Sequence, residues 1–224
     1  MSMVSCDVIL AAGGSGTRFG GAVNKVLAEL RGVPVLRYSL DLFGTHPAVR
    51  RVIIPCRPAD REAVAALADA WKNAHADASA PEILLTDGGA TRQASVYNAL
   101  LLCCEPLVLI HDGARPFATA AMIDACLDAL RTWPAVSTGV VSKDTVKLVN
   151  EAGVVLQTPD RAMTRLIQTP QGFRREELLA AHERFREIPV TDDCSLMELA
   201  GCPVRIVDGS YENIKITTPD DLRR

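Results

Sequence analysis

The 224-residue sequence has few aromatic residues, no long apolar run and no large excess of charge of either sign. Aromatic residues make up 4% of the chain, and no apolar segment reaches the ~18 residues that a membrane span needs. The N-terminus lacks a basic segment followed by an apolar one, so we expect no secretory signal. A net charge of −3 gives no basic surface for nucleic acid. These absences predict a cytoplasmic protein that binds neither membranes nor nucleic acids.

The cysteines lack the spacing of a metal site or of a disulfide framework. There are seven, an odd number, with no Cys-x-x-Cys pair and no histidines interleaved at zinc spacing. Most lie in apolar segments, where we expect small buried side chains in a reducing compartment. They are Cys6, Cys56, Cys103, Cys104, Cys126, Cys194 and Cys202.

A glycine-rich loop follows the first apolar run, with five glycines between positions 13 and 21. Glycine has no Cβ, so such a loop can bring backbone N–H groups against a phosphate. Arg18 and Lys25 add two cations that can hold a polyphosphate. The loop matches neither the Gly-x-Gly-x-x-Gly fingerprint, because Phe19 replaces its third glycine, nor the P-loop, because Ala22 replaces its lysine. It predicts nucleotide binding, with a plain glycine turn after a strand as the alternative.

Short apolar runs alternate with helical patterns over the first 141 residues. The expected strands are 8–11, 51–55, 83–86, 107–111 and 137–141. The expected helices, with apolar residues three or four apart, are near 36–43, 64–71, 95–103 and 119–130. This alternation predicts an α/β, Rossmann-like domain over residues 1–224, with a mostly parallel sheet and helices on both faces. Ligands of such sheets bind at the carboxyl ends of the strands, where the glycine loop lies.

Residues 142–157 break this alternation. They read as two short strands joined by a turn at 150–153, with no obvious helix to cover them. A two-stranded arm is marginally stable alone and usually packs on something else, often a second subunit. We therefore expect a protruding β-hairpin arm at about 142–158 that is used for dimerisation, with a simple surface hairpin as the alternative.

A carboxylate follows the apolar run 107–111. Hard cations prefer carboxylate oxygen, and an aspartate just beyond a buried strand is well placed to hold a magnesium ion that bridges phosphates. Asp112 is therefore the candidate metal ligand, and a helix cap or a turn is the alternative. We expect Arg115 to hold this loop in place through backbone carbonyl groups.

The remaining polar candidates are cations, glycines and hydroxyls in loops. Arg92 and Ser95 share one face of a helix that follows a pair of glycines. Further candidates in the last third of the chain are Arg161, Thr169, Thr191 and Lys215. Thr191 is predicted to begin a helix, and Lys215, between two isoleucines, is a site residue or an exposed residue of an edge strand. No Ser-His-acid set, Cys-His set or spaced carboxylate pair emerges. The inventory indicates phosphoryl or nucleotidyl transfer, in which the protein positions groups and neutralises charge.

Taken in order, these segments resemble the 2-C-methyl-D-erythritol 4-phosphate cytidylyltransferase family over nearly the whole chain. The first are Ala-Gly-Gly-Ser-Gly-Thr-Arg at 12–18 with Lys25, Asp-Gly-Gly at 87–89 with Arg92 and Ser95, and His-Asp-Gly-Ala-Arg-Pro at 111–116. The others are Asp-Arg at 160–161, Gln-Thr-Pro-Gln at 168–171, Thr-Asp-Asp at 191–193 and Asn-Ile-Lys-Ile-Thr-Thr-Pro-Asp-Asp-Leu at 213–222.

The resemblance implies that CTP and 2-C-methyl-D-erythritol 4-phosphate give CDP-methylerythritol and pyrophosphate, with Mg²⁺, in non-mevalonate isoprenoid synthesis. Arg18, Lys25 and Lys215 would be catalytic, the first two acting on the α-phosphate, and Asp112 would bind the metal. The implied nucleotide-binding residues are Ala11, Ala12, Gly13, Gly14, Ser15, Gly16, Gly89, Arg92, Ser95 and Asp112. The implied residues for the phosphate of the acceptor are Arg161, Thr169, Thr191 and Lys215.

The resemblance also implies a homodimer in which the arm reaches across and Arg161 serves the neighbouring site. Gly13 replaces the alanine of many members, and this Gly-Gly form also occurs in ribitol-5-phosphate cytidylyltransferases. Ala90 replaces a polar or acidic residue that some members carry, which leaves any base contact there to the backbone. The alternatives are a cytidylyltransferase for another polyol phosphate, such as ribitol 5-phosphate, and a non-catalytic nucleotide-binding protein.

Overall fold

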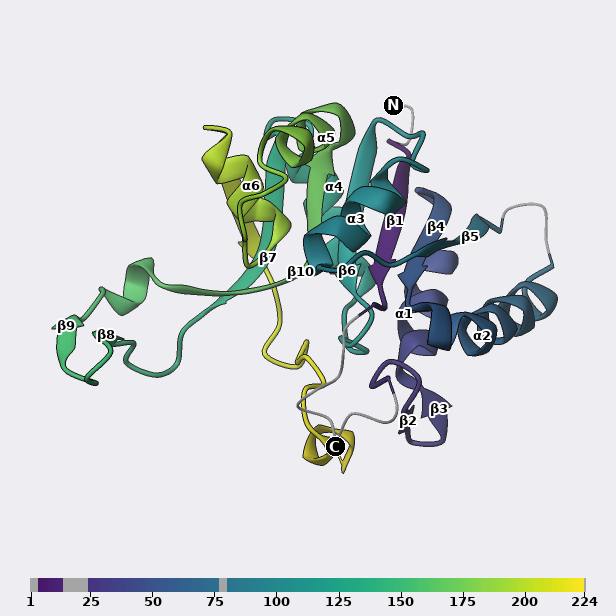
Figure 1. Cartoon of the computed structure of the whole chain (residues 1–224), viewed down its shortest axis with the longest axis horizontal. Coiled ribbons are helices and arrows are strands. Elements are labelled where there is room, and N and C mark those ends of the chain that lie inside the picture. The colour runs from purple at the N-terminus through teal and green to yellow at the C-terminus, as the bar shows by residue number, and fades with distance from the viewer. Residues whose placement is uncertain (1–3, 14–23, 77–79, 224) are drawn as a thin grey trace.

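A seven-stranded sheet forms the centre of the molecule, whose computed structural model describes residues 4–13, 24–76 and 80–223 (Figure 1). Across the sheet the strands are β11 (Val204–Asp208), β7 (Ala135–Val141), β10 (Arg165–Arg174), β6 (Leu107–Asp112), β1 (Cys6–Ala11), β4 (Val49–Cys56) and β5 (Glu82–Asp87). All neighbouring strands pair in parallel except β10, which is antiparallel to both β6 and β7. The predicted α/β class with a mostly parallel sheet is confirmed.

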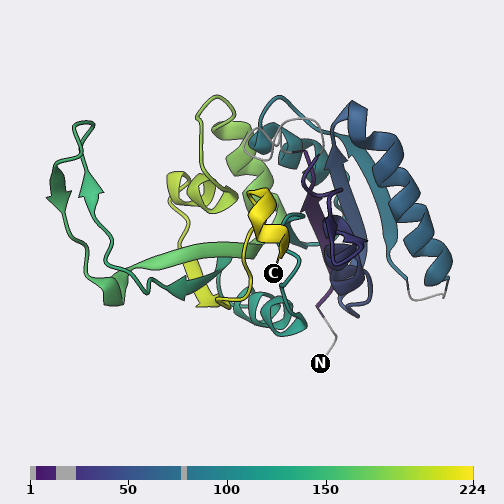
Figure 2. The same cartoon turned by 90° about the horizontal axis from the view of Figure 1, so that it is seen from below.

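Helices cover both faces of the sheet, as predicted (Figure 2). They are α1 (Val35–Gly44), α2 (Arg61–Ala74), α3 (Arg92–Leu100), α4 (Ala120–Ala129), α5 (Arg175–Arg184) and α6 (Asp193–Leu199). Cys6, Val8 and Leu10 of β1 share one hydrophobic cluster with α1, α2 and α4, whereas Ile9 shares a second cluster with α3, α5 and α6. Because successive side chains of a strand point to opposite faces, β1 is buried on both sides.

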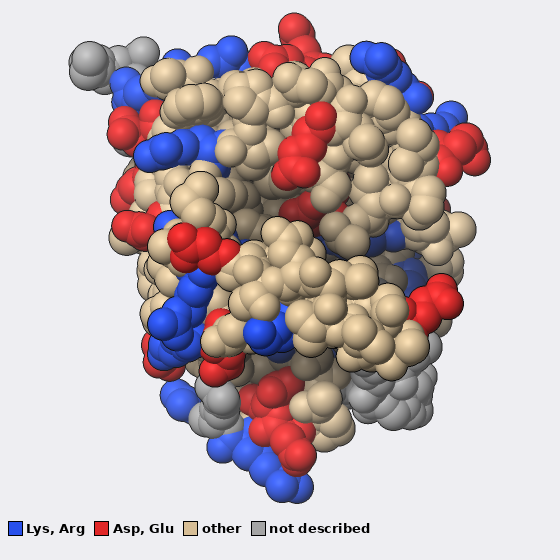
Figure 3. All heavy atoms as spheres, turned by 90° about the vertical axis from the view of Figure 1, so that its left-hand side faces the viewer, with Lys and Arg blue, Asp and Glu red and all other residues tan. Residues whose placement is uncertain are grey.

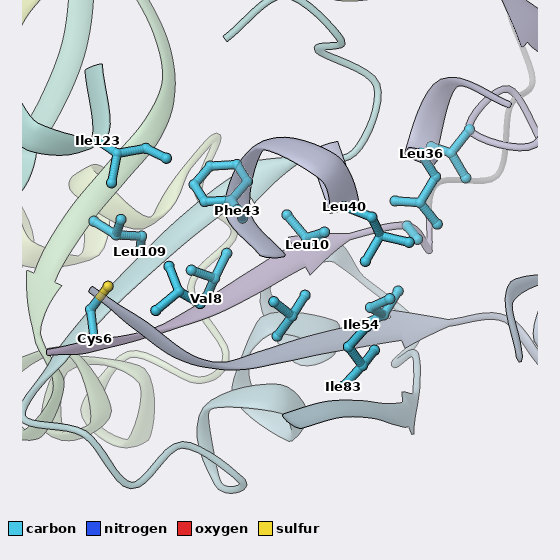
Figure 4. Close-up of a cluster of buried hydrophobic side chains, with 14 of the residues drawn as sticks. Cys6, Val8, Leu10, Leu36, Leu40, Phe43, Ile54, Ile83, Leu109 and Ile123 are labelled. Atoms are coloured by element: carbon cyan, nitrogen blue, oxygen red, sulfur yellow. The ribbon is translucent and has the colours of Figure 1, made fainter. Parts of the chain in front are cut away.

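Helix α1 packs on the first face through the spacing seen in the sequence. Leu36, Leu40 and Phe43 are fully buried, and Figure 4 shows them over Val8 and Leu10 of β1. Full burial of each such side chain contributes roughly 1.5–3 kcal/mol. This packing fixes the carboxyl end of β1, from which the glycine loop departs.

Two strands and one helix of the last third were not predicted. β10 contains Pro170 and Gly172, residues that normally argue against a central strand, and its pairing with β7 shifts register between Ile167 and Gln171. Here tertiary packing overrides local propensity. The other unpredicted elements are β11 and α5, whereas α6 is the helix expected near Thr191. The helix expected at 95–103 is α3, which begins three residues earlier, where the Thr91 side chain accepts a hydrogen bond from Ala94 N–H at 3.0 Å.

The remaining elements are short. They are the two-stranded sheet of β2 (Glu29–Leu30) and β3 (Val33–Pro34), the hairpin strands β8 (Leu148–Val149) and β9 (Val155–Gln157), and the 3-10 helices η2 (Pro58–Asp60), η3 (Arg161–Met163) and η4 (Pro219–Arg223).

Residues between β7 and β10 form an arm that projects from the sheet (Figures 1 and 2). The strands β8 and β9 pair in antiparallel fashion, and Gly153 closes the turn with φ +77°. Two short antiparallel strands thus lie in the segment where the sequence predicts a hairpin. Figure 3 shows this side of the molecule, with a broad area of uncharged surface between scattered charges. Exposed apolar side chains of the arm and its root are Leu148, Val149, Val154, Val155, Leu156, Met163, Leu166 and Ile167.

The cysteines behave largely as small core residues. All seven are free thiols, and five are buried, while Cys104 is exposed and Cys202 half-buried. Within the described ranges, none of the helices is both long enough and apolar enough to cross a membrane.

Gly44→Ala should destabilise the fold through one contact. A Cβ at position 44 would lie 2.4 Å from the ring of Trp71, which is fully buried and donates to Asp41 Oδ1 at 2.9 Å. We expect the free energy of unfolding in urea to fall by about 1–3 kcal/mol, typical of overpacking. In a Trp71→Phe background the loss should be much smaller, because the phenyl ring lacks the clashing atoms. An equal loss in both backgrounds would contradict this explanation.

Candidate active site

Two adjoining cavities lie at the carboxyl ends of β1 and β6. This is the edge of the sheet at which ligand binding is predicted from the sequence. The larger cavity has a volume of about 330 Å³ and the smaller about 250 Å³. Arg92, Asp112 and Lys215 line both. These three residues therefore form the wall between two neighbouring binding spaces.

The larger cavity brings together most of the predicted nucleotide residues that the structure describes. Those lining it are Ala11, Gly13, Gly89, Arg92, Ser95 and Asp112, and the predicted catalytic lysines Lys25 and Lys215 line it with them. Ala12 is not among the lining residues, because it is fully buried in the hydrophobic cluster of the α1 face. The predicted residues Gly14, Ser15, Gly16 and Arg18 lie outside the described ranges.

Lys25 is positioned by its buried neighbour Asn24, a residue that sequence reasoning missed. The Asn24 amide donates to Ala12 O and to Asp60 Oδ2, each at 2.8 Å. Arg57 donates in turn to the same carboxylate. The segment that begins at Asn24 is thus hydrogen-bonded to the end of β1 and to η2. Nothing in the sequence marked Asn24 except its place beside Lys25.

Gly89 and Ser95 act together to shape the floor of the larger cavity. Gly89 N–H donates to Ser95 Oγ at 2.9 Å, and that hydroxyl donates to Thr91 O at 2.9 Å. A Cβ at position 89 would lie 2.4 Å from Ala94 Cβ, so the loop packs too closely on α3 for a side chain. Ser95, predicted as a ligand contact, is also a structural anchor of the loop.

Asp112 is the electrostatic centre of the site. It is the last residue of β6 and is 8% exposed. Lys215 Nζ lies 2.7 Å from Oδ2, Arg115 Nε 3.7 Å from Oδ2, and Arg92 Nε 3.6 Å from Oδ1. Burial alone would raise the pKa of Asp112, but the charges of Arg92 and Lys215 outweigh it and hold the pKa well below its usual range. The carboxylate is therefore ionised at neutral pH.

Thr169 connects β10 to the end of β6. Its hydroxyl accepts from Asp112 N–H at 3.0 Å and lies 3.1 Å from His111 Nδ1. His111 Nε2 lies 3.0 Å from Arg115 O, so we assign the ring proton to Nε2 and the Thr169 hydroxyl as donor to Nδ1. Burial lowers the pKa of His111 to about 4, which keeps the imidazole neutral. The Thr169 hydroxyl is thus engaged within the protein.

Lys215 lies beside Asp112 on a loop that hydrogen bonds hold in place. It is not on a strand, so the alternative of an exposed lysine on an edge strand is wrong. Ile216 N–H donates to Ala114 O at 2.8 Å, and the Ile216 side chain is fully buried. Asn213 donates its amide to Thr169 O at 2.9 Å, while Arg115 donates to Asn213 O at 2.7 Å. The last bond confirms that Arg115 ties loops through backbone carbonyls.

The smaller cavity collects three of the four residues predicted for the acceptor phosphate. Thr169, Thr191 and Lys215 line it, whereas Arg161 is not among its lining residues in the described part of the chain. Arg161 lies on the arm in η3, where its guanidinium donates to Lys143 O at 3.2 Å. Thr191 does not cap the helix: Asp192 does, accepting from Ser195 N–H at 3.0 Å.

Arg92 has a second carboxylate partner that the sequence did not single out. Its Nη1 lies 2.6 Å from Oδ2 of Asp193, the first residue of α6. The sequence showed Asp193 only as one of the acidic residues that follow a helix start. A long-range pair of this kind has no local signal, because 101 residues separate the partners.

The site gathers cationic side chains around the carboxylate of Asp112. Lysine and arginine side chains line both cavities, and glycine backbone lines the larger one. Over the ranges that the structure describes, no three His, Cys, Asp or Glu residues converge as a metal site. Such a site can neutralise and position phosphate groups, and Asp112, the carboxylate that lines both cavities, is available to a cation.

Comparison with known proteins agrees with the resemblance seen in the sequence. A family model described as 2-C-methyl-D-erythritol 4-phosphate cytidylyltransferase matches residues 6–224. A protein of that name from Synechococcus elongatus is 42% identical over 219 residues, which cover 96% of this chain and 92% of the relative. One from Desulforamulus reducens is 38% identical over 220 residues, covering 96% and 91%.

Solved structures show the same relation. The 4-diphosphocytidyl-2C-methyl-D-erythritol synthase of Anaerococcus prevotii matches with a TM-score of 0.85 at 32% identity, covering 99% of this chain and 96% of that one. The 2-C-methyl-D-erythritol 4-phosphate cytidylyltransferase of Thermus thermophilus gives 0.74 at 29% identity, covering 98% and 95%. The chain therefore belongs to the 2-C-methyl-D-erythritol 4-phosphate cytidylyltransferase family.

Proposed function

We propose that this protein transfers CMP from CTP to 2-C-methyl-D-erythritol 4-phosphate, giving CDP-methylerythritol and pyrophosphate. One observation carries the proposal beyond family membership: Asp112 and Lys215 lie 2.7 Å apart in the wall between two cavities. One cavity holds Lys25 and the glycine backbone and fits a nucleotide triphosphate. The other holds Thr191 and fits a second, smaller phosphate. Two anionic reactants would meet at this wall.

The chemistry needs no general base. An oxygen of the acceptor phosphate attacks the α-phosphorus of CTP, a new P–O bond forms, and the bond to the bridging β-oxygen breaks to release pyrophosphate. A phosphate monoester is already an adequate nucleophile at neutral pH. What the protein must supply is alignment and positive charge. Lys25, and Arg18 on sequence grounds, stabilise charge at the α-phosphate, while Lys215 holds the incoming phosphate.

Asp112 fits a divalent cation, for which we propose Mg²⁺. The ammonium of Lys215 already rests on Oδ2, which marks this oxygen pair as a cation-binding position. Mg²⁺ commonly takes one or two carboxylates and fills its shell with phosphate oxygens and water, so a single aspartate suffices. The metal would neutralise charge on the triphosphate, and the residues around Asp112 orient that carboxylate.

The arm would complete the acceptor site of a second copy of the chain. Its apolar side chains are exposed along both hairpin strands, and its only described 3-10 helix carries Arg161 into solvent. An exposed apolar patch of this kind marks an interaction surface. A homodimer in which Arg161 reaches the partner's smaller cavity explains why this arginine is absent from the cavity of its own chain.

An acceptor panel tests the proposed reaction. With CTP and Mg²⁺, we expect pyrophosphate release with 2-C-methyl-D-erythritol 4-phosphate and little with ribitol 5-phosphate, because the smaller cavity selects the acceptor. Turnover with ribitol 5-phosphate but not with 2-C-methyl-D-erythritol 4-phosphate would contradict the proposal. It would instead support a cytidylyltransferase for another polyol phosphate. CTP binding without turnover of either would support a non-catalytic nucleotide-binding protein.

Lys25→Met should lower kcat by about 10²–10³, equivalent to about 3 kcal/mol, if Lys25 acts on charge that develops at the α-phosphate. Steady-state pyrophosphate release measures the effect. Lys72→Met is the matched control, since Lys72 lies near the end of α2 on the protein surface. A loss confined to KM for CTP would show that Lys25 binds the ground state only.

Mixing two variants that are both impaired at low acceptor concentration tests the swapped arm under that condition. Arg161→Met alone should mostly raise KM for the acceptor, and Lys25→Met should lower kcat. In a mixed dimer, one site pairs the intact Lys25 of one chain with the intact Arg161 of the other. Random reassociation should therefore restore about a quarter of the original sites. No recovery, with mixed dimers verified by mass spectrometry, would place Arg161 in the site of its own chain or outside any site.

A further inference from the structure

We propose that Asp193 is a positioning residue that holds the guanidinium of Arg92 off Asp112, and so leaves Oδ1 of Asp112 able to bind a divalent cation. The inference rests on the proposed role of Asp112 in the transferase. The Asp193 side chain itself lines neither cavity, so this role is indirect.

The distances show that Arg92 is hydrogen-bonded to Asp193 and not to Asp112. Arg92 Nη1 lies 2.6 Å from Asp193 Oδ2, a charge-assisted hydrogen bond, whereas Arg92 Nε is 3.6 Å from Asp112 Oδ1. Lys215 and Arg115 both approach the other oxygen of Asp112, Oδ2. Oδ1 is thus near a positive charge but not hydrogen-bonded to it, which leaves room for a metal.

Asp193 is buried beside α5. Its side chain is 1% exposed, and Oδ1 lies 3.2 Å from Nε2 of His182, itself 1% exposed, on α5. The burial of Asp193 makes its ion pair with Arg92 obligatory, because an unpaired buried carboxylate costs several kcal/mol. The neighbouring Asp192 cannot take over, since it caps α6 and accepts from Gln171 at 2.7 Å.

Without Asp193, Asp112 is the carboxylate among the described residues that remains within ion-pair distance of Arg92. The guanidinium needs to close only about 0.7 Å to make a hydrogen bond with Oδ1, given the usual N–H···O distance of about 2.9 Å. That bond would occupy the oxygen on which the metal depends. Asp193 therefore affects metal affinity through Arg92, and not through contact with the metal.

Mn²⁺ titrations at saturating CTP, followed by water-proton relaxation, test this without turnover. We expect Asp193→Asn to weaken Mn²⁺ binding on the order of tenfold, as loss of a supporting residue around a metal does. Arg92→Gln should bind Mn²⁺ at least as tightly as the unaltered protein. The double variant Arg92→Gln/Asp193→Asn should recover most of the loss, since no guanidinium remains to occupy Asp112. Glu198→Gln, an exposed change of the same kind on α6, is the control and should leave Mn²⁺ binding unchanged.

A purely structural role for Asp193 would give a different pattern. In that case the double variant would bind Mn²⁺ as weakly as Asp193→Asn or more weakly, which overturns the inference. Unchanged binding in Asp193→Asn overturns it as well. If Asp193→Asn does not fold, Arg92→Gln alone decides, and weaker Mn²⁺ binding there at saturating CTP is the overturning result. Failure of the proposed function is distinguishable: the unaltered protein would then bind no Mn²⁺, or Asp112→Asn would bind it equally well.

Discussion

The ion pair between Asp112 and Lys215 is the interaction on which the site depends. A carboxylate that is 8% exposed at the end of a central strand is stable only beside positive charge. Lys215 supplies that charge at 2.7 Å, and it comes from a loop about 100 residues further along the chain. The pair therefore joins the amino-terminal nucleotide half of the fold to its carboxyl-terminal segment, and both cavities share it as a wall.

The position of these site residues also depends on β10. The strand begins at the root of the arm, pairs with β7, and then enters the sheet between β6 and β7. Along that path it carries Gln168 and Thr169, which bond to the 209–213 loop and to the end of β6. One antiparallel strand thus links the arm, the smaller cavity and Asp112.

The elements of the first half of the fold could be predicted because their sequence patterns involve residues close together in the chain. Leu36, Leu40 and Phe43 showed the buried face of α1 by spacing alone, and the aliphatic run before Asp112 showed β6. The last third was harder, because β10 contains Pro170 and Gly172 and is stable only between two neighbours already in place. The helix after Thr191 was expected, but its cap is Asp192, one residue on. Several of the site-supporting residues missed by the sequence, such as Asn24 and Asp193, likewise act through partners far away in the chain.

The sequence by itself determined the class of fold, the resemblance to a cytidylyltransferase family and most of the side chains that meet at the larger cavity. These follow from periodicity and from short motifs, which are properties of neighbouring residues. Only the tertiary structure decided that Lys215 rests on Asp112, that Thr169 is engaged with His111, and that Arg92 is held by Asp193. Those contacts join residues 58 to 103 positions apart, and no local pattern encodes a distance in space.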